Sequence, residues 1–153
     1  GTTTAGNAPG VNDGASCVVV ASEEYASANG LASLARIVGH AAVAEEFAFL
    51  ARTPAAATRA VLAATGRQVA ELRRIEINEA FASVAVNSTR MLEVNEDIVN
   101  VNGGAIALGH PIGASGGRIV TTLVHELRRS GGGLGVAAMC SGGGQGDALL
   151  VEA

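Results

Sequence analysis

The 153-residue sequence predicts an α/β fold in which helices lie on the faces of a mixed, mostly parallel sheet. Three observations support this prediction. Apolar runs of strand length alternate along the chain with segments of helical periodicity. The chain is 48% hydrophobic and only 16% charged, which is typical of a protein with a well-buried core. Its 21 glycines concentrate at residues 102–117, 130–135 and 142–146, mostly just after predicted strands, where the backbone must approach something closely.

The first half of the chain is predicted to alternate strand, helix, strand and helix after a turn-rich opening at residues 1–15. Ser22 is a suitable N-cap because acidic Glu23 and Glu24 follow it in the first helical turn. Thr53-Pro54 opens an Ala-rich helix. The expected elements are a strand at 16–22, a helix from Ser22 to Asn29 that Gly30 ends, a strand at 34–44 and a helix from Thr53 to Gly66.

The second half continues the alternation and ends in a hairpin. Phe81, Val84 and Met91 recur at helical spacing, as do Ile119 and Leu123 further on. The expected elements are a strand at 73–77, a helix from about 78 to 94, a strand at 98–102, a helix from Gly113 to Arg129 and two terminal strands at 133–139 and 148–153.

Composition excludes several functional classes. The chain has no Lys, and its ten Arg are outnumbered by 14 acidic residues, so no basic stripe is available for nucleic acid. Its apolar runs are shorter than the ~20 residues of a membrane span. Cys17 and Cys140 lie outside any CxxC spacing, so neither a metal site nor a disulfide framework is expected, and a reducing cytoplasm is the predicted location.

His110 lies in the second of three glycine-rich or polar loops that follow predicted strands, the usual position of ligands in open α/β sheets. The flanking Gly109 and Pro111 predict a tight turn. An imidazole titrates near neutral pH and can act as a base, although without other signals a structural histidine bonded to the backbone is the favoured interpretation. His40, on a predicted strand, and His125, on a predicted amphipathic helix, are interpreted as structural.

Cys140 follows an apolar strand and precedes a run of glycines, whose N–H groups could surround a thiolate and lower its pKa. The alternative is a buried small hydrophobic residue at a strand end, and that interpretation is applied to Cys17, inside the apolar run SCVVV. Asn78, between a strand and a helix, could cap that helix or could hold a water or polarise a carbonyl. The glycines of GASGG are expected to pack a helix closely against the sheet.

Together these loops resemble the thiolase family. NEAFA at 78–82, NVNGGAIALGHPIGASGGRI at 100–119 and CSGGGQGDA at 140–148 stand in the family's order and at about its spacing. The opening GTTTAGNAPGVNDGA is similar to the segment at which thiolases return from their loop domain. The resemblance implies a layered thiolase-like fold, with residues 1–15 as that return segment, 16–153 as the C-terminal core domain and the N-terminal domain absent from this chain.

The resemblance also implies roles for individual residues. His110 would activate a nucleophilic cysteine, and Cys140 would move the α-proton of the acyl thioester. Asn78 would position a water that forms one oxyanion hole with His110, and the N–H of Gly142 would contribute to the second. Phe81 is expected to line the acyl pocket. The residues expected beside the pantetheine arm of coenzyme A are Ala5, Pro9 and Val11.

The family's nucleophile precedes everything in this chain, and Cys17 cannot replace it. The resemblance therefore implies an acyltransferase of acyl-CoA and coenzyme A, with no further cofactor and a preference for acetoacetyl-CoA, which is inactive as this chain alone. A homodimer or homotetramer is expected of the longer protein. The alternatives are a non-catalytic half that serves as a folding or assembly partner and, more distantly, a condensing enzyme of the ketoacyl synthase type.

Overall fold

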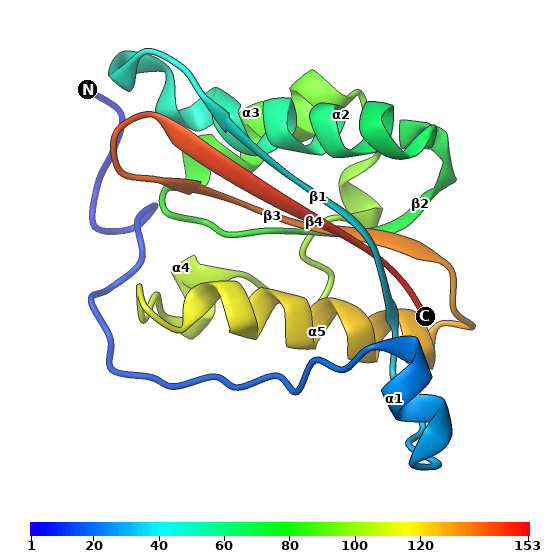
Figure 1. Cartoon of the computed structure of the whole chain (residues 1–153). Coiled ribbons are helices and arrows are strands. Elements are labelled where there is room, and N and C mark those ends of the chain that lie inside the picture. Colours follow the sequence, from blue (N-terminus) through cyan, green and yellow to red (C-terminus); the bar gives the residue numbers. More distant parts are fainter.

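A computed structural model describes residues 1–153 and contains one four-stranded sheet between two helical layers (Figure 1). The strands are β1 (Arg36–Ala44), β2 (Leu72–Ile77), β3 (Leu134–Ser141) and β4 (Gln145–Glu152). Their order across the sheet is β1-β4-β3-β2. The predicted α/β class, with helices on the faces of a mixed sheet, is confirmed.

The expectation of a mostly parallel sheet needs correction. β1, β2 and β3 run in the same direction, but β4 lies between β1 and β3 and is antiparallel to both. Only β2 and β3 pair in parallel. The terminal hairpin therefore inserts into the sheet instead of adding a strand at its edge, and two of the three pairings become antiparallel.

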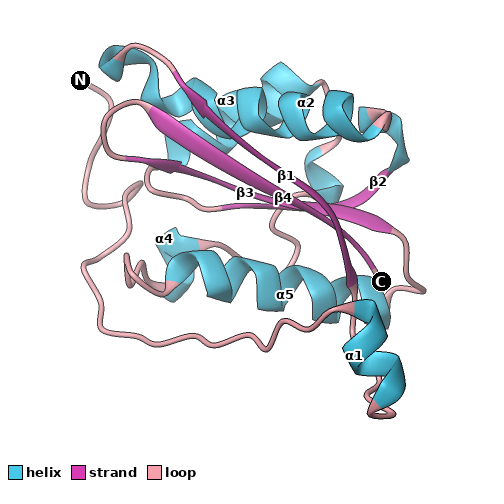
Figure 2. Cartoon of the chain, viewed as in Figure 1, coloured by secondary structure: helices cyan, strands magenta, loops and turns pink.

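Two helical layers cover the sheet because its strands alternate apolar residues between two faces. One layer contains α2 (Thr53–Thr65) and α3 (Ala82–Leu92), which pack on Ile75, Ile77 and Val136 in the larger core cluster. The other contains α4 (Ala105–Leu108) and α5 (Ser115–Arg129), whose Ile119 and Leu123 are fully buried in a smaller cluster. Figure 2 shows both layers, and none of these helices is both long and apolar enough to cross a bilayer.

Helix boundaries follow the predicted capping signals closely. The first helix, α1 (Glu23–Ala28), begins after Ser22, whose Oγ accepts a bond from the Tyr25 N–H at 3.1 Å. α2 ends at Gly66, whose φ of 68° is in the left-handed region that favours glycine. Three short 3₁₀ turns complete the chain: η1 (Phe47–Arg52), η2 (Val69–Glu71) and η3 (Glu96–Ile98).

Two predicted strands are absent. Residues 98–102 make a single bridge, from Val99 to Ile75 at the edge of the sheet, because the Asn100 side chain occupies the next backbone positions of β2. Residues 16–22 are extended but have no strand beside them, and their side chains are exposed. Cys17 is exposed as well, so the prediction of a buried cysteine there is wrong.

The extended segment before α1 runs along the outside of the α5 layer (Figure 1). Ser16 Oγ donates to the Ala114 carbonyl at 2.8 Å, and an added Cβ on Gly117 would overlap the Ser16 side chain. The expectation that these glycines pack the helix on the sheet holds only in part. A Cβ built on Gly116 would lie 3.5 Å from Met139 Sδ of β3, whereas Gly117 packs against the N-terminal segment.

Candidate active site

Three sequence-distant loops meet at the carboxyl ends of β2 and β3. The backbone N–H of Asn78, just after β2, donates to the Ala138 carbonyl of β3 at 2.9 Å. Asn78 is fully buried, and its side-chain Nδ2 lies 3.4 Å from Nε2 of His110. The loop after β2 and the loop between α4 and α5 therefore meet, which brings the predicted residues Asn78 and His110 into contact.

Asn78 does not cap the following helix. The N-cap of α3 is Phe81, three residues later, and Asn78 uses its side chain for contacts across the site instead. Its Oδ1 accepts a bond from Arg118 Nη2 at 3.3 Å. The capping interpretation is thus wrong, and the amide is available to act on His110.

The His110 ring is held at its other nitrogen by Ser115. His110 Nδ1 and Ser115 Oγ are 2.7 Å apart, and the same hydroxyl donates its proton to the Pro111 carbonyl at 3.0 Å. A serine hydroxyl has one proton, so the oxygen must accept from His110 Nδ1–H. Neutral His110 then has its lone pair on Nε2, which faces Asn78 and the open end of the site.

Burial favours the neutral form of this histidine. Desolvation, and secondly the positive charge of Arg118, lower the pKa of His110 below its ordinary value. At neutral pH the ring is therefore uncharged and its Nε2 is a free base. These are the properties that a general base requires.

The loop that carries His110 is braced from two sides. Glu79 accepts from Asn100 Nδ2 and from the Ile106 N–H, both at 3.0 Å, and so joins the 78–81 loop to the start of α4. The His110 N–H donates to Asn12 Oδ1 at 3.1 Å. Gly109 has a φ of 99°, and an added Cβ there would lie 2.7 Å from that Asn12 oxygen, so the loop requires glycine.

Cys140 reaches the same end of the sheet from the opposite face. Alternation along β3 directs Val136, Ala138 and Cys140 into the core cluster under α2 and α3, whereas Asn78 and His110 lie on the α5 side. Only 6% of Cys140 is exposed, and burial raises the pKa of its thiol. The expectation that glycine N–H groups lower this pKa is wrong, because desolvation raises it and the only opposing contribution is a bond from the backbone of Cys140 itself.

Gly142 lies in the tip of the β3–β4 hairpin, two residues beyond Cys140. The tip comprises residues 142–144, and Gly143 and Gly144 have φ of 84° and 71°. Nothing lies within 4 Å of a Cβ built on Gly142. The residue is thus exposed beside the candidate site.

The residues expected near coenzyme A follow one path across the mouth of the site. Val11 bridges to His110 and is 96% exposed, and the Asn7 carbonyl accepts from the Ala82 N–H at 2.9 Å, next to Phe81. Phe81 itself is 39% exposed. Ala5 lies in the turn stabilised by Thr4 and Asn7, and half-buried Pro9 lies between that turn and Val11. The segment therefore runs from Phe81 to His110.

Several polar residues that the sequence did not single out support the site. These are Glu76, Glu79, Asn100, Ser115 and Arg118. Ser115 and Arg118 lie within the GASGGRI motif, and Glu79 lies within NEAFA. Their position in these motifs was the only feature of the sequence that could have marked them as site residues. Their partners are 5 to 40 residues away in sequence, which is why the contacts themselves could not be predicted.

Glu76 and Arg118 form a second buried polar group behind Asn78. Glu76 is 2% exposed, and burial raises its pKa to about 7, with Arg118 opposing that rise. Glu76 Oε2 and Arg118 Nε and Nη1 are buried without a protein hydrogen-bond partner. Because Glu76 and Asn78 alternate onto the same face of β2, the Arg118 guanidinium lies near both.

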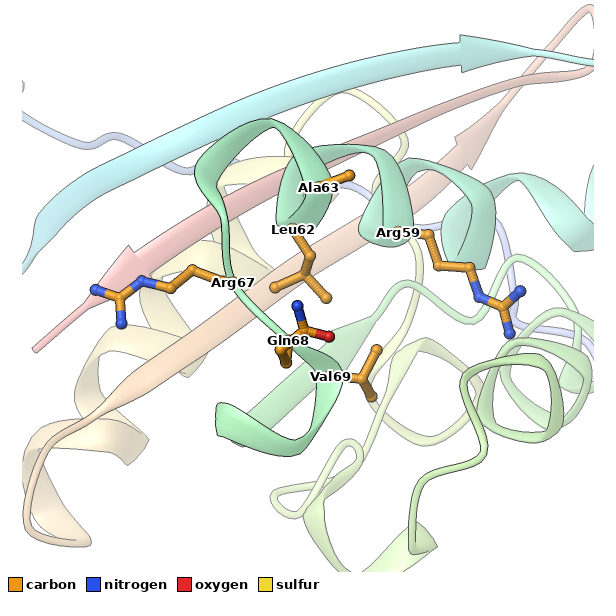
Figure 3. A pocket seen from close by; sticks show the side chains of 6 residues that line it. All are labelled: Arg59, Leu62, Ala63, Arg67, Gln68 and Val69. Atoms are coloured by element: carbon orange, nitrogen blue, oxygen red, sulfur yellow. The ribbon is translucent and has the colours of Figure 1, made fainter.

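A shallow pocket of about 200 Å³ lies elsewhere, at the carboxyl end of α2 (Figure 3). Its lining residues are Arg59, Leu62, Ala63, Arg67, Gln68 and Val69. These residues lead into the start of β2, whereas His110 and Cys140 lie at the ends of β2 and β3. The pocket therefore lies at the opposite end of the strands from the candidate site. His, Cys, Asp and Glu side chains are nowhere grouped to hold a metal ion.

Together, an α/β fold with a neutral histidine base, a buried cysteine and flanking glycine loops at one sheet edge defines a candidate acyl-transfer site. The sequence profile of the thiolase C-terminal domain matches residues 31–153. The chain belongs to the thiolase family.

Curated relatives and solved structures agree with this assignment. A probable acetyl-CoA acetyltransferase of Escherichia coli is 52% identical over 152 residues, which are 99% of this chain and 39% of that protein. A probable acetyl-CoA acetyltransferase of Mycobacterium tuberculosis is 51% identical, with 100% and 39% covered. The chain thus spans about two fifths of the length of the relatives it matches.

The solved structures extend the likeness to the backbone. The acetyl-CoA acetyltransferase of Bacillus anthracis superposes with a TM-score of 0.96 at 43% identity, over 99% of this chain and 38% of that one. Human mitochondrial 3-ketoacyl-CoA thiolase, in a complex with CoA, gives a TM-score of 0.91 at 39% identity, over 99% and 39%. The layered thiolase-like fold expected from the sequence is thereby confirmed.

Proposed function

We propose that this chain supplies the acid/base half of a thiolase active site, for acyl transfer between acyl-CoA thioesters. The reaction is thiolysis of acetoacetyl-CoA or another 3-ketoacyl-CoA, or the reverse Claisen condensation. The observation that carries the proposal is the contact of Asn78 Nδ2 with His110 Nε2 at 3.4 Å, in a ring whose Nδ1 is already bonded to Ser115. This arrangement leaves a neutral base at the mouth of the site.

In the proposed reaction, His110 takes the proton of a nucleophilic cysteine that this chain does not contain. The thiolate attacks the 3-keto carbon, and the bond between C2 and C3 breaks to leave an acyl-enzyme and the enolate of acetyl-CoA. Cys140 donates its thiol proton to that enolate. The Cys140 thiolate then takes the proton of an incoming coenzyme A, whose sulfur attacks the acyl-enzyme.

Two oxyanions form in succession, so two sets of donors are needed. Protonated His110 and a water positioned by Asn78 would together stabilise the enolate oxygen. The N–H of Gly142 would stabilise the tetrahedral oxyanion together with the nucleophile's own N–H. Such donors each contribute roughly 3 to 4 kcal/mol to transition-state stabilisation. Phe81 would line the acyl pocket, and Ala5, Pro9 and Val11 would contact the pantetheine arm.

The longer protein would be organised as its relatives suggest. Residues 1–15 would be the return segment from a loop domain and 16–153 the C-terminal core domain. We expect a homodimer or homotetramer that acts in the reducing cytoplasm, in fatty acid metabolism, with no cofactor beyond its coenzyme A substrates. The exposed apolar residues at 18–20 support association with further protein surface.

The test is an acetoacetyl-CoA thiolysis assay on the complete gene product, with His110→Ala beside wild type. We expect the substitution to slow thiolysis and to slow alkylation of the nucleophile by iodoacetamide, because no base would remove its proton. A complete gene product that carries a nucleophilic cysteine but shows unchanged thiolysis in His110→Ala would sink the proposal. If the gene product has no such cysteine, the non-catalytic folding or assembly partner becomes the better account.

A further inference from the structure

The Asn78 amide acts together with Ser115 on which ring nitrogen of His110 carries the proton. An asparagine amide has an oxygen that accepts and a nitrogen that donates, and the two ends can exchange by rotation. With Nδ2 toward His110, the amide donates to Nε2 and favours the lone pair there. With Oδ1 toward His110, it would accept from Nε2 and favour a proton there, which would remove the base.

Arg118 is the residue that distinguishes these two orientations. A guanidinium only donates, so its Nη2, 3.3 Å from Oδ1, is compatible with the amide oxygen and not with the amide nitrogen. From Arg118 onward every bond in the network runs in one direction. Arg118 donates to Asn78 Oδ1, Asn78 Nδ2 donates to His110 Nε2, His110 Nδ1 donates to Ser115 Oγ, and Ser115 donates to the Pro111 carbonyl.

Arg118 is itself firmly placed. It lies on the second turn of α5, where its N–H bonds to the Ala114 carbonyl at 3.0 Å. Its Nε and Nη1 are buried and have no protein hydrogen-bond partner. The charged groups that act on the nearby Glu76 carboxyl are Arg118 itself, Glu79 and Glu126. Arg118 is half-buried, and keeping a cation with two of its nitrogens shielded from water and so few direct partners is costly, which indicates a function beyond packing.

We propose that Arg118 is a positioning residue that locks the Asn78 amide with its nitrogen toward His110, and thereby sets His110 in the Nδ1–H form. This inference rests on the proposed function, because that function needs a free Nε2. Arg118 does not touch substrate in this role. It acts through Asn78.

The test uses long-range proton–nitrogen correlation NMR of the ring nitrogens in the 153-residue chain, which has three histidines to assign. Wild type should show neutral His110 with an unprotonated Nε2. In Arg118→Met, we expect the Nε2–H form to become the major one, since the amide is free to turn and the Ser115 hydroxyl can rotate to donate to Nδ1. The matched control is Arg90→Met, at an exposed helical arginine, which should leave the His110 tautomer unchanged.

A second variant covers the case in which Arg118→Met does not fold. Arg118→Met combined with Glu76→Gln removes both buried charged groups, so no unpaired charge remains, and it should show the same change of tautomer. Arg118→Lys, which keeps a donor near Oδ1, should restore part of the wild-type form. An unprotonated Nε2 that persists in the folded Met variants would overturn the inference.

Activity separates this inference from the proposed function. In the complete gene product, we expect Arg118→Met to lower kcat for thiolysis about tenfold or more with little change in KM, because the base and not the binding surface is altered. If the gene product has no thiolase activity but the tautomer changes, the function fails and the positioning role stands. If thiolysis depends on His110 but the His110 tautomer is unchanged in Arg118→Met, only the positioning role fails.

Discussion

The loop that carries His110 and the hairpin that carries Cys140 surround their reactive side chains in different ways. His110 lies on the α5 side of the sheet within a polar network, with both ring nitrogens bonded. Cys140 lies on the α2 and α3 side, within an apolar cluster. Burial nevertheless acts on both in the same sense, since it disfavours charge: the pKa of His110 falls and that of Cys140 rises.

The consequence is a site that holds a neutral base and a neutral acid at the same pH. A base must be unprotonated before it can act, and an acid must be protonated, so both groups are ready without any exchange with solvent. One physical cause would thus prepare both of the opposite chemical roles proposed for these residues. The following predictions test this difference between the two regions, in order of expected effect.

The largest effect is expected at Cys140. In the complete gene product, Cys140→Ala should lower thiolysis of acetoacetyl-CoA by on the order of 10³-fold, because the enolate loses its proton donor. Acyl-enzyme formation, followed by intact-protein mass spectrometry, should still occur because it depends on His110. The matched control is Cys17→Ala, at the exposed cysteine, which should retain wild-type activity. Loss of both steps in a folded Cys140→Ala protein would contradict the division of roles.

The buried carboxyl behind the histidine loop should make stability depend on pH. Because burial raises the Glu76 pKa from its ordinary 4.5 to about 7, folding takes up a proton between these values and stability falls as pH rises through this window. Glu76→Gln resembles the protonated form. It should increase the free energy of unfolding by up to about 3 kcal/mol at pH 8 and by little near pH 4.5.

Urea unfolding at these two pH values measures the effect. Glu24→Gln, at an exposed position of α1, is the control and should change stability by only a few tenths of a kcal/mol at either pH. A Glu76→Gln protein that is equally destabilised at both values would show that the carboxylate makes a needed contact in its charged form.

A smaller effect separates the two cysteines of the chain. Iodoacetamide should modify exposed Cys17 at least about tenfold faster than Cys140 at pH 7.5, because the Cys140 thiol is buried and its raised pKa leaves little thiolate. Peptide mass spectrometry of a time course gives both rates in one sample. Unfolding the chain in urea should make the two rates similar. If Cys140 were labelled faster than Cys17 in the folded chain, the Cys140 thiol would be accessible to solvent, and its burial would be contradicted.

The smallest effect is expected where the N-terminal segment supports the histidine loop. Asn12→Ala removes the acceptor of the His110 N–H and should lower the free energy of unfolding by about 1 kcal/mol. Asn29→Ala, whose side chain bonds only to the Tyr25 carbonyl at the end of α1, is a control remote from the site. Thermal unfolding followed by circular dichroism compares them. If Asn12→Ala matches wild type, the segment does not hold the loop.

Local signals predicted the elements whose ends depend on single residues. Ser22 and Gly66 bound α1 and α2 as expected, since capping acts between neighbours in sequence. The two absent strands show the limit of local signals. A β-branched run such as 18–20 has strand propensity, but a strand requires a partner, and no segment of this chain pairs with it.

The sequence by itself determined most of the strands and helices, the family, and the loops that carry His110 and Cys140, because periodicity, turn residues and motifs are properties of short segments. Only the tertiary structure decided the placement of β4 between β1 and β3, the direction of the Asn78 amide and the opposite pKa shifts of His110 and Cys140. Those depend on contacts such as the one between Asn78 and Arg118, 40 residues apart, and on how much water the packed chain excludes.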